Sequence, residues 1–74
     1  MNFTVEYPDN YYLDLKASAQ EPLTFSVVNE NGERIFTETG TVIDKENVRL
    51  KLAKGQYSFS MSATSMFELN CTLR

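Results

Sequence analysis

Apolar and polar residues alternate with a period of two along most of this chain. The alternation is clearest at residues 48–52, where aliphatic side chains alternate with the cations of Arg49 and Lys51. Successive side chains of a β-strand point to opposite faces, so this pattern predicts a strand with one buried face. Residues 57–64 repeat the pattern with hydroxyls on the polar face, and residues 67–74 repeat it again. Each of these C-terminal segments is therefore expected to be a half-buried strand.

The N-terminal half shows the same period in residues 2–7, 11–17 and 23–27. Pro8-Asp9-Asn10 favours a turn after the first of these segments, and Gln20-Glu21-Pro22 breaks the pattern before the third begins. The side chains predicted to face the core are Phe3, Val5, Tyr7, Leu13, Leu15, Ala17, Leu23, Phe25, Val27, Val48, Leu50, Leu52, Tyr57, Phe59, Met61, Ala63, Phe67, Leu69, Cys71 and Leu73.

The turn at Asn31-Gly32 decides which side chains of the following strand are exposed. A two-residue turn at this dipeptide pairs Val27 with Phe36. A three-residue loop that ends in a left-handed glycine and carries a bulge pairs Val27 with Ile35 instead. The two pairings turn opposite faces of the strand toward the core.

The second pairing is preferred because of the residue that would lie opposite Phe25. With the two-residue turn Phe25 faces Glu38, whose charge is costly to cover, whereas with the three-residue loop it faces Thr37. The preferred pairing makes Phe36 point outward.

No segment shows apolar residues at helical spacing, and β-branched and aromatic residues occur throughout the chain. The sequence therefore predicts an all-β fold: a small antiparallel β-sandwich of about six to seven strands, jelly-roll or Ig-like. Gly32, Gly40 and Gly55 are interpreted as turn residues, with Lys54-Gly55 as a tight reversal. No linker or repeat interrupts the pattern, so residues 1–74 are expected to form a single domain.

The composition, with 42% apolar and 23% charged residues in 74, is that of an ordinary small globular domain of modest stability. The 10 acidic and 7 basic residues are scattered, giving a net charge of −3. No Lys or Arg cluster could neutralise a phosphate backbone, so direct nucleic-acid binding is not expected. No segment resembles a membrane helix or a signal peptide. The expected location is the cytoplasm, with secretion only if the sequence is a fragment.

The residue types that usually carry out catalysis are almost absent. The chain has no His to transfer protons near neutral pH. Its single cysteine, Cys71, is in phase with the apolar face of its strand and is expected to be an inert thiol. Without a second thiol or a His no metal site is expected, and no Gly-rich loop is present to hold a nucleotide. The chain is therefore not expected to be an enzyme or to bind a cofactor.

Four segments occur in a suggestive order: Leu23-Thr24-Phe25-Ser26-Val27, Asn31-Gly32 followed by Ile35, Leu52-Ala53-Lys54-Gly55-Gln56-Tyr57, and Phe67-Glu68-Leu69-Asn70-Cys71. From about Tyr11 onward the chain thereby resembles the bacterial pre-peptidase C-terminal domain, a jelly-roll-like β-sandwich attached to many secreted proteases. The resemblance implies that the third segment opens a hairpin and that Tyr57 packs in the core. Some members bind polysaccharide or calcium, but Asp9 and Asp14 lack the spacing of a calcium loop. The resemblance thus supports a sandwich and does not carry the family's function over.

Large side chains outside the predicted core are candidates for a contact surface, because aromatic residues often anchor interfaces and sugar-binding platforms. Tyr12 and Phe36 fall on polar strand faces in the preferred register. Single exposed aromatics also occur on surfaces without a function. The candidate binding residues are Tyr11, Tyr12, Phe36 and Met66.

The predicted function is a non-catalytic protein-interaction module, for example a small phage or bacterial protein that binds and inhibits a host protein. One alternative is a carbohydrate- or ligand-binding accessory domain, as in the resembled family, with Tyr12 and Phe36 as its platform. Another alternative is a structural or virion assembly subunit. A homo-oligomer would form through a strand edge, with the uncharged segment Ser58–Thr64 as a candidate.

Overall fold

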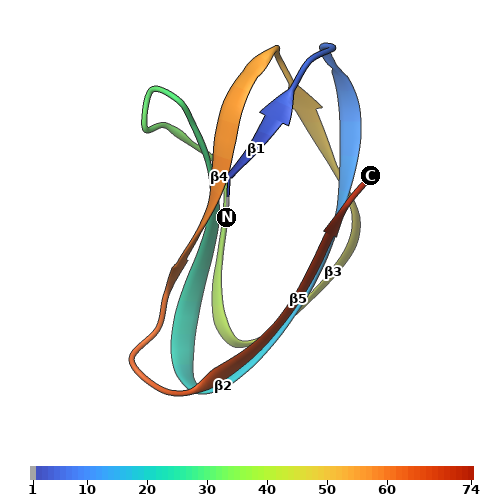
Figure 1. Cartoon of the computed structure of the whole chain (residues 1–74). Coiled ribbons are helices and arrows are strands. Elements are labelled where there is room, and N and C mark those ends of the chain that lie inside the picture. The colour runs from blue at the N-terminus through green and yellow to red at the C-terminus, as the bar shows by residue number, and fades with distance from the viewer. Residues whose placement is uncertain (1) are drawn as a thin grey trace.

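The computed structural model describes residues 2–74, which form five antiparallel strands and no helix (Figure 1). The strands are β1 (Asn2–Val5), β2 (Asp9–Asn29), β3 (Arg34–Leu52), β4 (Gly55–Ser62) and β5 (Phe67–Leu73). The period-two alternation of the sequence is matched by an alternation of buried and exposed residues along β2. The predicted all-β class is therefore confirmed. The predicted number of about six to seven strands is too high, because β2 and β3 are each one long strand.

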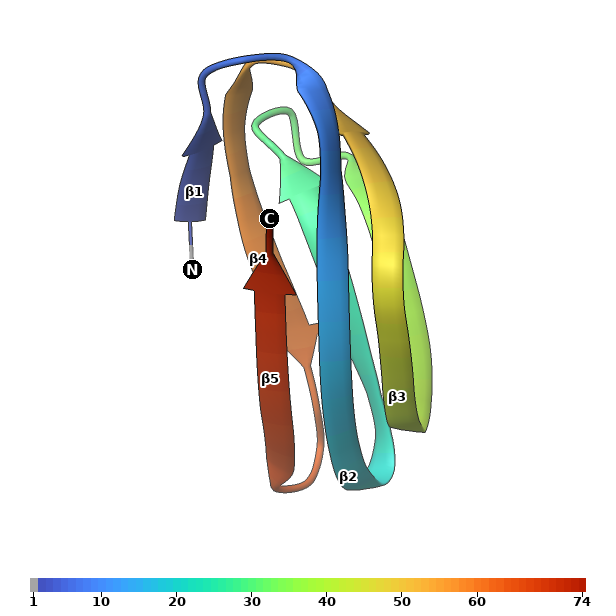
Figure 2. The same ribbon diagram turned by 90° about the vertical axis from the view of Figure 1, so that its right-hand side faces the viewer.

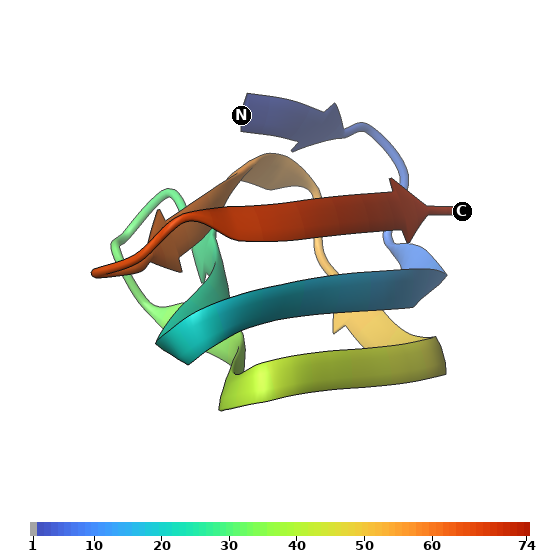
Figure 3. The same cartoon turned by 90° about the horizontal axis from the view of Figure 1, so that it is seen from below.

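Two layers are formed because β2 and β3 make one long hairpin that bends in its middle (Figures 1 and 2). The β5 layer contains β5, residues 9–18 of β2 and residues 42–52 of β3, which lie side by side in Figure 3. The β4 layer contains β1, β4, residues 23–29 of β2 and residues 34–40 of β3. This arrangement is consistent with the predicted sandwich. The choice between jelly-roll and Ig-like connectivity stays a prediction.

The bend corrects two predictions from the sequence. Residues 20–22 do not separate two strands, because β2 continues through them, and Gly40 is not a turn, because it pairs with Leu23 inside β3. The register of β2 against β3 shifts between Ser18 and Leu23. Pro22 has no N–H to donate to a ladder, so it fits a position where pairing is interrupted. The chain does reverse direction here, as the fold of β2 at the bottom of Figures 1 and 2 shows, but it does so within one continuous strand.

The hairpin turn after β2 has the predicted left-handed glycine, with φ 81° at Gly32. The Asn29 side-chain oxygen accepts hydrogen bonds from the N–H groups of Asn31 (3.0 Å) and Glu33 (2.9 Å). The Gly32 N–H donates to the Asn29 carbonyl at 3.0 Å. An Asn at the start of the turn thus satisfies the loop's own backbone groups.

The pairing beyond this turn is not the predicted one. Val28 pairs with Arg34, but Val27 pairs with Phe36, which leaves Ile35 as the extra residue of a bulge. One extra residue exchanges the two faces of a strand. The prediction that Phe36 points outward is therefore wrong: Phe36 packs against the core, and Ile35 is 38% exposed.

The charge of Glu38, which argued against this pairing, stays at the rim of the fold. Glu38 does pair with Phe25, but its side chain keeps 32% of its surface exposed. Its carboxylate lies 3.9 Å from the Lys45 Nζ, which belongs to the other half of β3. Because β3 pairs only with β2 among the described strands, it lies at the edge of the sheet. The inward carboxylate of Glu38 therefore reaches both solvent and the positive charge of Lys45.

The core lies between the two layers. Its most deeply buried side chains are Phe25, Leu13, Leu15, Leu23, Leu52 and Val27. An aromatic row crosses the inner face of the β4 layer, with ring centroids 5.5 Å apart for Tyr57 and Phe3, 5.0 Å for Phe3 and Phe59, 5.6 Å for Phe59 and Phe25, and 6.4 Å for Phe25 and Phe36. Such stacked, tilted and edge-on contacts stabilise a core beyond simple burial.

Two tyrosine hydroxyls hydrogen-bond to the backbone four residues earlier, in the connection that precedes their strand. Tyr57 packs in the core, as the resemblance implies, and its hydroxyl donates to the Ala53 carbonyl at 2.7 Å. The hydroxyl of Tyr11 likewise donates to the carbonyl of Tyr7 at 2.8 Å.

The hairpin that the resemblance implies is wrong, because β3 and β4 do not pair and Lys54-Gly55 leads from one layer to the other. Tyr7, predicted inside, is 75% exposed because β1 ends before it.

Candidate functional site

The most distinctive feature of the surface is the free edge of β5. Residues 67–73 pair with residues 13–19 of β2 without a register shift, and β5 has no other partner among residues 2–74. Tyr12 and Arg74 extend this ladder by exchanging both backbone hydrogen bonds, at 2.7 and 2.9 Å. Figure 2 shows β5 at the border of its layer.

The hydrogen-bond pattern identifies which backbone groups are free. In an antiparallel ladder, pairs that exchange two hydrogen bonds alternate with pairs that exchange none. Because Arg74 belongs to a bonded pair, residues 68, 70 and 72 also bond to β2. The N–H and C=O groups of the alternate residues point away from β2, toward the open edge. These residues are Phe67, Leu69, Cys71 and Leu73.

The inward side chains of β5 are incompletely covered. Phe67 and Leu69 pair with Ala19 and Ala17 of β2, in phase with the buried Leu15. Nevertheless Phe67 is 45% exposed and Leu69 is 42% exposed. The sequence predicted that both are buried, and that prediction is wrong. An unpaired backbone edge and uncovered apolar side chains therefore occur together on one strand.

The β3 edge differs, because it carries the features that usually prevent strands from pairing by chance. Register shifts interrupt its pairing with β2 near both ends, and the bend at Gly40 divides it. Its cationic residues are Arg34, Lys45, Arg49 and Lys51. Charges, especially Lys, and bulges discourage edge-to-edge association. β5 has no Lys, Pro, Gly or register shift, and Glu68 is its one charged residue, so its edge is less protected than that of β3.

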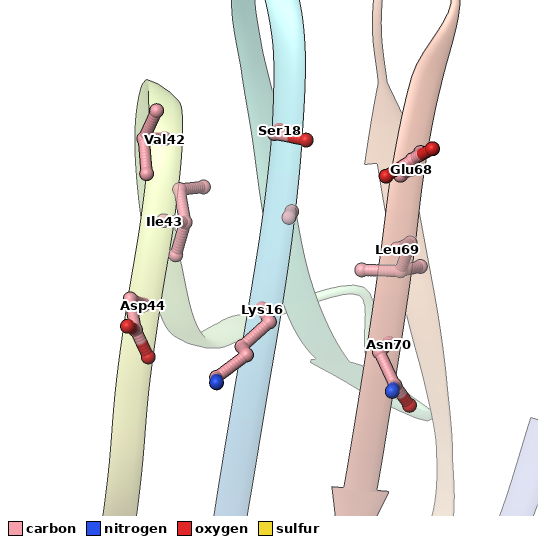
Figure 4. Close-up of a pocket in the computed structure, with 9 residues that line it drawn as sticks. Lys16, Ser18, Val42, Ile43, Asp44, Glu68, Leu69 and Asn70 are labelled. Carbon is pink, nitrogen blue, oxygen red and sulfur yellow. The ribbon is translucent and has the colours of Figure 1, made fainter.

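The outer face of the β5 layer has a shallow hollow of about 410 Å³. Figure 4 shows Lys16 on the central strand, with Asp44 from β3 on one side and Asn70 from β5 on the other. Glu68 and Ser18 line the hollow further along. Lys16, Asp44 and Asn70 are exposed, and the hollow contains neither a thiol nor a His. It offers polar contacts of both charges but no nucleophile paired with a base.

The structure does not bring the candidate residues from the sequence together. Tyr12 is 39% exposed on the outer face of the β5 layer, while Phe36 packs on the inner face of the β4 layer. They cannot form a shared platform. Tyr11 is half-buried against the core. Met66 is 92% exposed in the connection that leads into β5, where it adjoins Phe67.

Arg74 joins the three strands of the β5 layer at one end. Its guanidinium donates to the Asp14 carboxylate of β2 and to the Asn47 side chain of β3. Asn47 has φ 55° at a shift in register, and its N–H donates to Asp14 at 2.9 Å. This backbone hydrogen bond and the nearby guanidinium hold the pKa of Asp14 below its usual value of 3.8.

Acid is expected to destabilise the wild-type protein more than an Asp14→Asn variant. Because the pKa of Asp14 is lower in the folded than in the unfolded state, its ionised form stabilises the fold at neutral pH. That stabilisation decreases once the pH falls below 3.8, the pKa of Asp14 in the unfolded chain, and it disappears as the pH falls through the lower pKa of the folded state. Thermal unfolding from neutral to strongly acidic pH measures this. A difference between the proteins that stays constant with pH would contradict the assignment.

Cys71 lies on the inward side of β5, and burial raises the pKa of its thiol above the usual 9.0. Iodoacetamide reacts with the thiolate, so alkylation at mildly alkaline pH is expected to be slower in the folded protein than in urea. Mass spectrometry of quenched samples gives both rates. Equal rates would show that the thiol is not shielded.

Metal-binding clusters of three or more His, Cys, Asp or Glu side chains do not occur among residues 2–74. The same residues include no helix that is long and apolar enough to cross a membrane. Comparison with protein-family models, curated proteins and solved structures finds no match to this chain. The resemblance to the pre-peptidase C-terminal domain therefore stays a prediction.

Proposed function

We propose that this chain is a non-catalytic protein-interaction module that binds an extended segment of a partner protein at the free edge of β5. The observation that carries the proposal is the coincidence of free backbone groups with half-exposed Phe67 and Leu69 on an edge that has a single charged residue and no bulge. Strand addition uses both features: main-chain hydrogen bonds supply affinity, and alternate side chains supply specificity.

The geometry also indicates how a partner would be held. Its backbone would bond to the odd-numbered residues of β5, and every second side chain would point inward. Those side chains would cover Phe67 and Leu69, removing apolar surface from water at about 25 cal/mol per Å². Met66, next to this surface and almost fully exposed, adds a flexible apolar contact.

The two alternative functions have different support. A sugar platform built from Tyr12 and Phe36 has no support, because these side chains lie on different layers. Assembly into a larger structure uses the same kind of edge and is one form of the proposed module. Among residues 2–74, β1 pairs with only Ser58 of the segment Ser58–Thr64, so this segment also has an open side. It suits strand addition less well than β5 because its inward Phe59 and Met61 already pack against the core. Inhibition of a host protein by a phage or bacterial chain is another form of the module.

A capture experiment with two matched variants tests the proposal. Tagged wild-type protein, Leu69→Lys and Val42→Lys are each incubated with bacterial lysate that also contains an untagged copy of the chain. Leu69 and Val42 are exposed aliphatic residues at opposite edges of the β5 layer, so both variants change the charge equally. Thermal melts confirm that all three proteins are folded.

The wild type and Val42→Lys are expected to retain the same bound protein, either foreign or the untagged copy, and Leu69→Lys is expected to lose it. A charge on the inward side of an added strand is costly to cover. Capture of nothing above background by the wild type, or equal capture by Leu69→Lys, would overturn the proposal.

A further inference from the structure

We infer that the strand added to β5 belongs to a second copy of this chain, paired antiparallel about a two-fold axis through Asn70. The inference rests on the proposed function and specifies its partner. A symmetric dimer requires one surface that is complementary to itself. The residues of β5 meet this requirement in one register better than in its neighbours.

The hydrogen-bond pattern restricts the possible registers. The free backbone groups of β5 belong to odd-numbered residues, because the even-numbered residues bond to β2. Two copies that pair through these edges must each offer odd-numbered residues to the other. Each bonded pair therefore joins two odd positions, and the two-fold axis passes through a residue position. Asn70 lies at the middle of β5.

The register centred on Asn70 uses the whole strand. It pairs Phe67 with the partner's Leu73 and Leu69 with the partner's Cys71, so both uncovered apolar side chains gain an apolar neighbour. Centring the axis on Cys71 instead leaves Phe67 without an opposite residue in β5. Centring it on Leu69 leaves Leu73 without one.

The outer side of the same register places no like charges opposite each other. Glu68 lies opposite the partner's Thr72, and Asn70 lies opposite the partner's Asn70. Like charges directly opposite would destabilise a strand pair, whereas two amides can hydrogen-bond. The result is one sheet that runs without a break from β3 of one copy to β3 of the other.

Engineered cysteines test this register. Asn70 belongs to a pair without mutual hydrogen bonds, in which opposite Cα atoms lie about 4.5 Å apart, within reach of a disulfide. The variant Asn70→Cys is made together with Cys71→Ser and oxidised under mild conditions. Thr72→Cys with Cys71→Ser is the control, since position 72 lies opposite the partner's Glu68. The wild type, which keeps Cys71, is oxidised in parallel.

We expect most of the Asn70→Cys protein to become a covalent dimer, while the Thr72→Cys protein and the wild type stay uncrosslinked. Faster crosslinking of wild-type Cys71 would place the axis at residue 71 and overturn the inference. The inference would also be overturned if the Asn70→Cys protein does not crosslink and sedimentation shows a monomer at high concentration. If that failure accompanies Leu69-dependent capture of a foreign protein, the interaction module stands without the homodimer; if capture also fails, both proposals are wrong.

Discussion

Replacing Phe25 by Ala is expected to reduce the free energy of unfolding by about 3–5 kcal/mol. Phe25 is fully buried in the aromatic row, between Phe59 and Phe36. Its removal loses the burial of the ring and leaves a cavity that strands on both sides cannot fill without breaking their pairing. A single core in a domain of this size rarely supplies more than about 3–5 kcal/mol, so the variant should be largely unfolded or close to it. Urea denaturation followed by circular dichroism measures the change.

Tyr12→Ala is the matched control for this experiment. Tyr12 is an aromatic residue of the same long strand, but it lies on the outer face and is 39% exposed. Its replacement should change stability far less than that of Phe25. Equal losses in the two variants would mean that the inner and outer faces of β2 are assigned incorrectly.

The second large effect is expected from Leu13→Ala, which should reduce the free energy of unfolding by about 2–5 kcal/mol. Leu69→Ala should reduce it by only about 1 kcal/mol in dilute protein. Both leucines face inward in the β5 layer, but Leu13 is fully buried and Leu69 is 42% exposed. The comparison isolates the effect of how far the opposite layer covers the side chain, because the residue type and the layer are the same. Denaturant unfolding at low protein concentration gives both values.

Protein concentration adds a further expectation to the comparison. If β5 edges pair, the cost of Leu69→Ala should rise with concentration, since association stabilises only the folded state. A cost for Leu69→Ala as large as that for Leu13→Ala in dilute protein would show that β5 is already covered within one chain.

The sequence predicts the fold class and most of the core because period-two alternation directly reports strand faces. Leu13, Leu15, Phe25 and Val27 are all buried as predicted. Tyr57 also packs inside as expected. These positions depend only on which face of a strand points inward, and the local pattern contains that information.

Three features could not be obtained from the pattern, each for a physical reason. The bulge at Ile35 depends on the balance between turn geometry and core packing, and it turns the side chain of Phe36 from the outer to the inner side of the sheet. The bend at residues 20–22 has the same local signals as a turn. The exposure of Leu69 depends on where the opposite layer ends. Alternation identifies the inward face of a strand but not whether another layer covers it, so the candidate site on β5 was missed.

Amide hydrogen exchange along β5, measured by NMR at several protein concentrations, tests the central claim most directly. The amides of Asn70 and Thr72 bond to β2 and should exchange slowly at every concentration. The amides of Leu69 and Cys71 should exchange quickly in dilute protein and become slow as concentration rises and the edge is paired. Fast exchange of Leu69 and Cys71 at all concentrations would contradict pairing between copies, and slow exchange in dilute monomer would contradict the free edge itself.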